Sequence, residues 1–222
     1  MSPRPVNHQA RDALLDASRT EFARAGLDRT RVEDIARRAG VSKGAFYLHF
    51  DSKEHAFREI LQRFLGALEE ELRRRREADA AFLGELGCPT AAALEQVIAH
   101  DCRADRELLE VLWRNRLILA ALDHTAASPD LEIVADFRRR MRLLLAEDVV
   151  LKQRQGWLRR DVAPDVVGDV IVGAFESYGR RMHQLRAKPD LGVWARSMNA
   201  LFYEGMVDPA HRPAALRPPP RK

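Results

Sequence analysis

Residues 30–53 read TRVEDIARRAGVSKGAFYLHFDSK, and this stretch decides the fold of the N-terminal region. Thr30 and Glu33 have the spacing of a capping box, so we expect a short helix to begin there. Gly40 predicts a tight turn after that helix, and Ser42 can cap the helix that follows. Two short capped helices joined by a tight turn indicate a helix-turn-helix.

The sequence on either side of this stretch predicts two further helices. One covers residues 8–25, with Leu14 and Phe22 on its apolar face, and Gly26 stops it. The other begins at Lys53 and continues to about residue 77. A third helix of about seven residues is marginal alone, so we expect packing by Val41, Phe46 and Phe50 to fix it.

In a helix-turn-helix the second helix enters the major groove, and its N-terminal residues meet the base edges. Lys43 can donate to a guanine edge or a phosphate, Gly44 lets the backbone approach DNA, and Ala45 offers only a methyl group. Tyr47 and His49 are predicted to point outward and to contact phosphates. The predicted DNA-binding residues are Thr30, Arg31, Ser42, Lys43, Gly44, Ala45, Tyr47, His49 and Lys53.

The segment from residue 30 to 54 closely resembles the DNA-binding signature of the TetR (tetracycline repressor-like) family. The matching elements are Asp-Ile-Ala at 34–36, Ala-Gly-Val-Ser at 39–42, Tyr-x-His-Phe at 47–50 and Ser-Lys-Glu at 52–54. Taken together they are highly specific, whereas any one alone is weak. Ala45 departs from the pattern, because many members have Thr there, and the operator preference stays open.

The resemblance implies an all-α protein. Its N-terminal three-helix helix-turn-helix head is joined by a long helix to a helical ligand-binding and dimerisation domain. We expect three parts: residues 1–52, an arm and DNA-binding head; residues 53–208, the helical domain; and residues 209–222, a disordered Pro/Arg tail. Beyond the fourth helix the sequence predicts helices at roughly 90–102, 105–122, 129–155, 164–187 and 190–206, after breaks at Gly84, Gly87 and Pro89.

The 222-residue composition is that of a globular protein, with 46% hydrophobic and 32% charged residues. The net charge of +4 is too small to prove a nucleic-acid partner, since residues 1–60 contain 11 Lys and Arg against 9 Asp and Glu. Cys88 and Cys102 are predicted to be two reduced thiols, although a disulfide between them is left open. No signal peptide or membrane span is predicted, so we expect a cytoplasmic protein without cofactors.

The last two predicted helices are apolar beyond one stripe, which requires a second packing partner. The resemblance implies a four-helix bundle with the mates of a second copy, although a monomer core is the alternative. Glycines at 168, 173 and 179 would permit close helix approach. The predicted dimerisation residues are Val167, Val170, Ile171, Ala174, Trp194, Met198, Leu201 and Phe202.

In this family the middle helices enclose a pocket for a small inducer. The candidate ligand-binding residues are Cys102, Trp113, Arg116, Phe137, Met141, Phe175 and Tyr178. Each of them could instead serve core packing. The effector is unknown, and the resemblance leaves repression and activation both open, with repression of a palindromic double-stranded operator by a homodimer expected.

Two other features suggest chemistry but have simpler explanations. Arg73–Arg76 lie about 31 Å along the helix from Lys53, so a solvated helix face is predicted. His100, Asp101 and Cys102 are adjacent on a helix and point in different directions, so we expect no zinc site. No catalytic motif suggests an enzyme. The alternative function is a helical small-molecule-binding or scaffold protein without DNA affinity, which salt-dependent DNA binding would distinguish.

Overall fold

The computed structural model describes residues 8–87, 89–123 and 131–207. Within these ranges the helices are α1 (His8–Arg29), α2 (Val32–Arg38), α3 (Lys43–Tyr47), α4 (Lys53–Leu86), α5 (Ala91–Arg114), α6 (Arg116–Asp123), α7 (Leu131–Arg154), α8 (Pro164–Met182) and α9 (Leu191–Met206). The only extended pairing in the same ranges is an isolated antiparallel bridge between Leu158 and Val207. The predicted all-α fold is therefore confirmed.

None of the helices in the described part of the chain is both long and apolar enough to cross a bilayer. Our predictions for the N-terminal arm, Cys88, the start of the helix at 129–155 and the tail at 209–222 lie outside the described residues.

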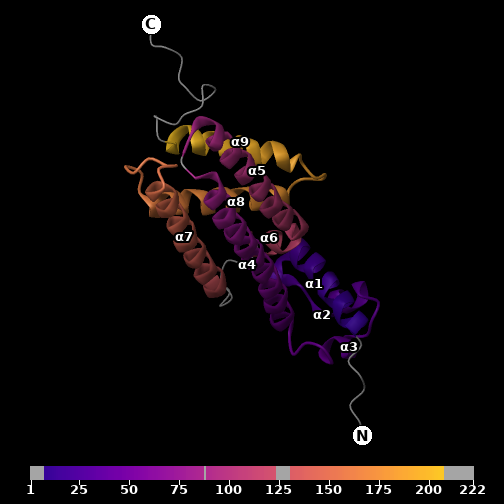
Figure 1. The fold of residues 1–222 in the computed structure, drawn as a ribbon. Helices are drawn as coiled ribbons and strands as arrows, with labels where there is room; N and C mark the ends of the chain where they lie inside the picture. Colours follow the sequence, from indigo (N-terminus) through magenta and orange to yellow (C-terminus); the bar gives the residue numbers. More distant parts are fainter. Residues whose placement is uncertain (1–7, 88, 124–130, 208–222) are drawn as a thin grey trace.

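Helices α1–α3 form a head at one end of the molecule, and α4 leads from that head into the bundle of α5–α9 (Figure 1). At 1.5 Å per residue, the 34 residues of α4 span about 50 Å. α1 packs against both α4 and α6, α5 packs against α9, and α7 packs against α8. The head is thus in contact with the bundle through α6 as well as through α4.

Two glycines interrupt the helical backbone of the head at the positions the sequence predicts, although α1 resumes after Gly26 and continues to Arg29. Gly26 has φ 76° and ψ 163°, which breaks the helical geometry of α1 near its end. Gly40 has φ 70°, a left-handed conformation that glycine adopts without strain, and it makes the turn between α2 and α3. These two positions set the angles at which α1, α2 and α3 meet.

A phenylalanine cluster fills the interior of the head. The rings of Phe22 and Phe57 meet edge to face at 5.5 Å, and those of Phe46 and Phe50 lie 5.4 Å apart. All four are almost completely buried, and Val41 packs against the same core. The predicted anchoring of α3 by Val41, Phe46 and Phe50 is confirmed, and it explains how so short a helix is held.

Several predicted helix ends in the bundle were wrong. α4 continues to Leu86, through Gly84, because its last turns pack and pair with α5, and it ends at Gly87 with φ 67°. α5 is unbroken past residue 102 and ends at Arg114, capped by Asn115, whose side-chain amide donates to the Val111 carbonyl. α8 ends at Met182, since the amides of residues 184 and 185 bond three residues back in a turn.

Candidate functional site

The outer face of α3 is the first candidate site. The Ser42 hydroxyl oxygen accepts a hydrogen bond from the Ala45 amide (3.1 Å), which caps the helix. Phe46 is buried beneath, so Lys43, Gly44 and Tyr47 face outward, with half of Tyr47 exposed. Leu48 was not predicted, yet it is the most exposed large apolar side chain in the described residues, at 82%.

Gly44 lies on this face without a packing reason to be glycine. A Cβ atom added there would come no closer than 3.8 Å to any neighbour, the Ser42 hydroxyl. The absent side chain therefore leaves space on the outside of the helix rather than within the head, where it would let another molecule approach the backbone.

Lys43 forms an ion pair that the sequence did not suggest. Its ammonium lies 2.6 Å from a carboxylate oxygen of Glu33 on α2, and both side chains are about half exposed. The hydrogen bond from Lys43 lowers the pKa of Glu33, and the same contact raises the pKa of Lys43. An acidic residue is therefore part of this otherwise neutral and basic face.

Thr30 and Lys53 do not lie where we predicted. Thr30 is buried, and its hydroxyl donates to the carbonyl oxygens of Gly26 (2.7 Å) and Glu21 (3.2 Å). The expected capping box is wrong, since Arg31 occupies the N-cap of α2 without a side-chain cap bond. Arg31 itself is exposed.

The Lys53 ammonium donates to the carbonyl oxygens of Asp28 (2.8 Å) and Thr30 (3.1 Å). It thus holds the loop between α1 and α2 against the start of α4. His49 is half-buried rather than outward, and its buried Nδ1 has no hydrogen-bond partner among the described residues. Thr30 and Lys53 therefore stabilise the head by hydrogen bonds to its own backbone.

The second candidate site is a cavity of about 190 Å³ lined by residues of α4–α9. It extends over apolar side chains of α4, α5 and α7, including Phe64, Leu108 and Phe137. Three of the predicted ligand-binding residues line it: Phe137, Met141 and Phe175.

The other four predicted ligand-binding residues do not line the cavity. The Arg116 guanidinium stacks on the Trp113 ring at 4.4 Å and donates a hydrogen bond to the Trp113 carbonyl oxygen, so these two residues contact each other rather than the cavity. Tyr178 packs on Trp194 at 5.1 Å. Cys102 is half-buried on another face of α5, and burial raises the pKa of its thiol. Helical spacing alone could not tell which face of α5 meets the cavity.

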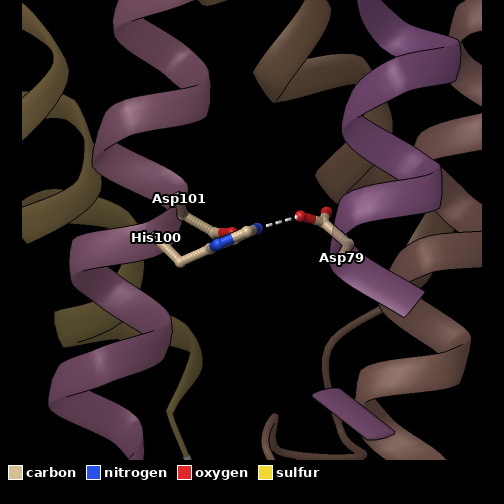
Figure 2. A group of neighbouring side chains, drawn as sticks. All are labelled: Asp79, His100 and Asp101. Atoms are coloured by element: carbon tan, nitrogen blue, oxygen red, sulfur yellow. Dashed lines mark hydrogen bonds and ion pairs between the residues drawn. The ribbon is translucent and has the colours of Figure 1, made fainter. Parts of the chain in front are cut away.

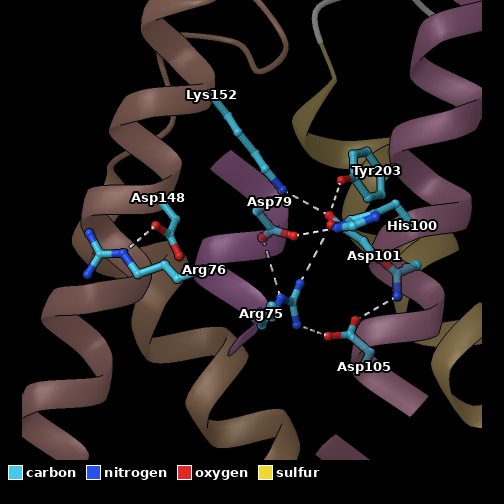
Figure 3. Close-up of polar contacts among 10 residues, drawn as sticks. Arg75, Arg76, Asp79, His100, Asp101, Asp105, Asp148, Lys152 and Tyr203 are labelled. Atoms are coloured by element: carbon cyan, nitrogen blue, oxygen red, sulfur yellow. Dashed lines mark hydrogen bonds and ion pairs between the residues drawn. The ribbon is translucent and has the colours of Figure 1, made fainter. Parts of the chain in front are cut away.

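A network of buried charges adjoins this cavity (Figure 3). Arg75 of α4 pairs with Asp105 of α5 and lies 3.7 Å from carboxylate oxygens of Asp79 and Asp101. Lys152 of α7 donates to Asp101 at 2.9 Å. We predicted that residues 73–76 form a solvated face, and for Arg75 this was wrong, since its side chain is only 18% exposed.

α9 completes the network. The Tyr203 hydroxyl donates to Asp101, and the Asn199 amide donates to Asp105 at 2.7 Å. Burial and the neighbouring Asp101 raise the pKa of Tyr203 well above its usual value, so the hydroxyl stays protonated. Burial by itself would raise the pKa of Asp101, but the charges of Lys152 and Arg75 outweigh it and lower that pKa to about 2.

Asp79, His100 and Asp101 come close enough to suggest a metal site (Figure 2), with ligand atoms within 4.8 Å of one another. His100 and Asp101 belong to α5, and Asp79 reaches them from α4, which the sequence could not indicate. The His100 Nε2 and an Asp79 oxygen are 2.6 Å apart, and Asp101 already bonds Lys152 and Tyr203. With two cations beside it, this donor set fits an ion-pair network better than a cation.

The third candidate surface is the outer side of α8 and α9. Val166, Val170, Val193 and Leu201 are exposed there, with Leu201 at 75%. A Cβ atom at Gly173 would meet nothing within 4 Å. Both α8 and α9 therefore expose apolar side chains in the single chain.

Several of the predicted dimerisation residues make contacts within the chain. Val167 and Met198 are buried within the chain, and Ile171, Met198 and Phe202 line the 190 Å³ cavity. Trp194 is half-buried under Tyr178 and Arg181. Ala174 is half-buried, and Val170 and Leu201 face outward. α8 packs against α7 and α9 packs against α5, so the inner faces of both helices already have partners within the chain.

Comparison with known proteins agrees with this architecture. Residues 14–60 match the family described as "Bacterial regulatory proteins, tetR family". The HTH-type transcriptional repressor KstR2 of Rhodococcus jostii is 45% identical over 73 residues, 31% of this chain but only 36% of that protein. The HTH-type transcriptional repressor DhaR of a Mycobacterium strain is 27% identical over 173 residues, 78% of this chain and 81% of that protein.

Solved structures share the whole fold. KstR2 of Mycobacterium tuberculosis, a ketosteroid transcriptional regulator, superposes with a TM-score of 0.65 and 20% identity over 89% of this chain and 95% of that chain. NalD of Pseudomonas aeruginosa, the secondary repressor of a multidrug efflux pump, gives 0.64 and 21% over 93% of this chain and 100% of that chain. The helix-turn-helix head thus matches the tetR family of bacterial regulatory proteins over residues 14–60, and the chain as a whole shares its fold with these two solved regulators.

Proposed function

We propose that the chain is a repressor that binds a palindromic operator as a homodimer and is released by a small molecule. In this proposal residues 1–52 bind DNA, residues 53–208 bind the ligand and the second copy, and residues 209–222 form a tail. The observation that carries the proposal is the outer face of α3, where a lysine, a glycine and a half-exposed tyrosine share one short, firmly packed helix.

Of the residues predicted from the sequence, the proposed DNA-binding surface contains only those that are accessible in the structure. It comprises Arg31, Ser42, Lys43, Gly44, Ala45 and Tyr47, to which the exposed Leu48 is added. Gly44 permits close approach of the backbone to the groove, and Ala45 and Leu48 suit contacts to thymine methyl groups. Lys43 and Tyr47 suit base edges or phosphates.

The dimer uses the outward apolar side chains of α8 and α9 with the open position at Gly173. Covering these side chains with their counterparts in a second copy would remove them from water through a twofold interface. Two α3 helices related by that axis would bind half-sites about one helical turn, roughly 34 Å, or a multiple of it apart.

Release by a ligand rests on the position of α4. This helix lines the cavity with Phe64, Leu65 and Leu68, and it begins at Lys53, which is bonded to the head. A ligand that binds one orientation of α4 better than another would change head spacing and thus DNA affinity, by its difference in affinity for the two states.

Selection of genomic fragments by the purified full-length protein, followed by sequencing, tests the proposal. Enrichment of one or a few palindromic sites is expected at low salt without added ligand. Affinity for the selected site should fall steeply as salt rises, because phosphate contacts release counterions. Failure to enrich any site, in a folded dimer, would contradict operator binding and favour a binding protein without DNA affinity.

Substitutions locate the surface. Tyr47→Ala and Lys43→Ala should each weaken binding to the selected site by about tenfold or more, as loss of one DNA contact does. Arg74→Ala is the matched control, since Arg74 is exposed on α4, far from the head, and pairs with Glu71. Fluorescence anisotropy with labelled DNA measures all three, and equal losses would refute the placement.

A further inference from the structure

Two cavities of the bundle adjoin each other and share one charged lining residue. The 190 Å³ cavity and a smaller one of about 90 Å³ share Leu72, Arg75, Met141, Leu145 and Ile171 among their lining residues. Arg75 is the only charged member of the shared set. Arg75 is therefore one of the charged groups that a molecule in the larger cavity would contact, and it also borders the smaller cavity.

The larger cavity is almost wholly apolar. Of its described lining residues, only Arg75, Asp105, Arg138 and Glu176 are charged. Arg75 pairs with Asp105, and Arg138 pairs with Glu176. The body of an occupant would therefore be hydrocarbon, held by burial of apolar surface.

The smaller cavity shows the same balance. Its two further cations, Lys152 and Arg76, pair with Asp101 (2.9 Å) and Asp148 (3.4 Å). Each described cation that lines either cavity thus has a carboxylate beside it already. An incoming carboxylate or phosphate would find no unmatched cation, and burial of an unmatched charge costs several kcal/mol.

Arg75 can still donate hydrogen bonds. A guanidinium group has five N–H donors. One nitrogen of Arg75 bonds Asp105, whereas the oxygens of Asp79 and Asp101 are 3.7 Å away, beyond a normal hydrogen bond. A neutral oxygen would fit this place, because it accepts a hydrogen bond and adds no charge.

We propose that the effector is an uncharged, mainly apolar molecule whose single hydroxyl or carbonyl oxygen accepts a hydrogen bond from Arg75, and that carboxylates and phosphates are excluded. The effector role rests on the proposed function, whereas the binding preference does not. The cavity is somewhat larger than the roughly 150 Å³ cavity that holds benzene, so ligands of about that size or slightly larger would fit.

Three probes with one skeleton test the preference: octan-1-ol, octanoate and octylammonium, titrated calorimetrically into the full-length protein at pH 7.5 without DNA. We expect octan-1-ol to bind about a hundredfold more tightly than octanoate, because the acid must lose its charge or bury it. Octylammonium should also bind more weakly than the alcohol. Equal or tighter binding of either ion, or absence of octan-1-ol binding, would overturn the proposal.

Cavity-filling variants separate the cavity from surface adsorption. Leu112→Trp and the milder Val172→Phe place larger side chains on the lining and should abolish octan-1-ol binding. Leu143→Trp is the matched control, since Leu143 is 61% exposed on α7 and should leave binding unchanged. Equal binding by all three folded variants would refute the site. Since no DNA is present, failure here leaves operator binding untouched, and failure to select DNA leaves this preference intact.

Discussion

The head and the bundle are built from the same kind of helix but differ in what fills their interiors. The head has a phenylalanine core, with Phe22, Phe46 and Phe50 almost fully buried. The bundle has two cavities and a buried network around Arg75 and Asp101. A close-packed core holds one shape, whereas a cavity bordered by paired charges leaves room for a second molecule. The head is thus suited to present a fixed surface and the bundle to respond to a ligand.

The strongest test of this difference in packing replaces one phenylalanine in each region with alanine. Phe46→Ala should cost the protein about 4 kcal/mol, because the packed core of the head cannot fill the space. Phe137→Ala should cost clearly less, since that ring borders an existing cavity and lacks contacts on one side. Urea unfolding followed by circular dichroism compares the two. Equal losses would mean that the bundle is packed as tightly as the head.

The buried charge network around Arg75 and Asp101 should make the free energy of unfolding depend on pH in the acid range. Because the pKa of Asp101 is lowered to about 2 from an ordinary 3.8, its ionised form stabilises the fold above pH 4, and this contribution disappears as pH falls towards 2. The loss amounts to about 2 kcal/mol. Asp101→Asn should destabilise the protein by about 3 kcal/mol at pH 7, because Lys152 and Arg75 lose a partner.

The denaturant midpoint, measured from pH 5 to pH 2, tests this contribution. The parent should lose stability more steeply than Asp101→Asn, and the two curves should converge at the acid end. Parallel curves would show that other carboxylates, such as Glu21 of the head with its own lowered pKa, cause the acid sensitivity.

The sequence determined the head far better than the bundle. Gly40, Ser42 and Phe46 act through neighbours a few residues away, so local spacing predicted the turn, the cap and the anchor correctly. Thr30 and Lys53 make contacts that the sequence analysis did not predict. Their contacts to carbonyl oxygens within the head depend on how α1 meets α4, which no local pattern contains.

In the bundle the decisive contacts join distant residues. Arg75 lies in a run of four arginines, and only its angle on α4 brings it to Asp105, 30 positions later. Asp79 reaches His100 from another helix in the same way. Apolar periodicity identified α8 and α9 but could not separate Val167, buried inside, from Val170, which is exposed. Hydrophobic spacing predicts a buried face without saying which neighbour buries it.

A single charged substitution tests whether the exposed apolar side chains of α8 and α9 form the dimer interface. Leu201→Glu places a carboxylate at a position 75% exposed in the single chain, so folding should be unaffected. If α8 and α9 pair with a second copy, the variant should dissociate to monomers and lose operator affinity. Leu143→Glu, on the exposed side of α7, should remain dimeric. Analytical ultracentrifugation distinguishes these outcomes, and a dimeric Leu201→Glu would place the interface elsewhere.

The smallest expected effect concerns the surface of the head, where an acid opposes its proposed role. Glu33 holds Lys43 at 2.6 Å, and its negative charge faces the same side as α3. Because both side chains are about half exposed, the pair adds little stability, yet it competes with DNA phosphates for the lysine. Glu33→Gln should therefore tighten operator binding severalfold and leave the urea midpoint unchanged.

Anisotropy titrations over a range of salt concentrations measure this gain. Glu95→Gln is the matched control, because Glu95 is exposed on α5 and its substitution removes the same net charge. The gain should be largest at low salt, where phosphate attraction is strongest. A similar gain in the control would mean that net charge alone is responsible. Weaker binding by Glu33→Gln would mean that the Glu33 carboxylate positions Lys43 for the groove. The ion pair would then favour DNA binding rather than compete with it.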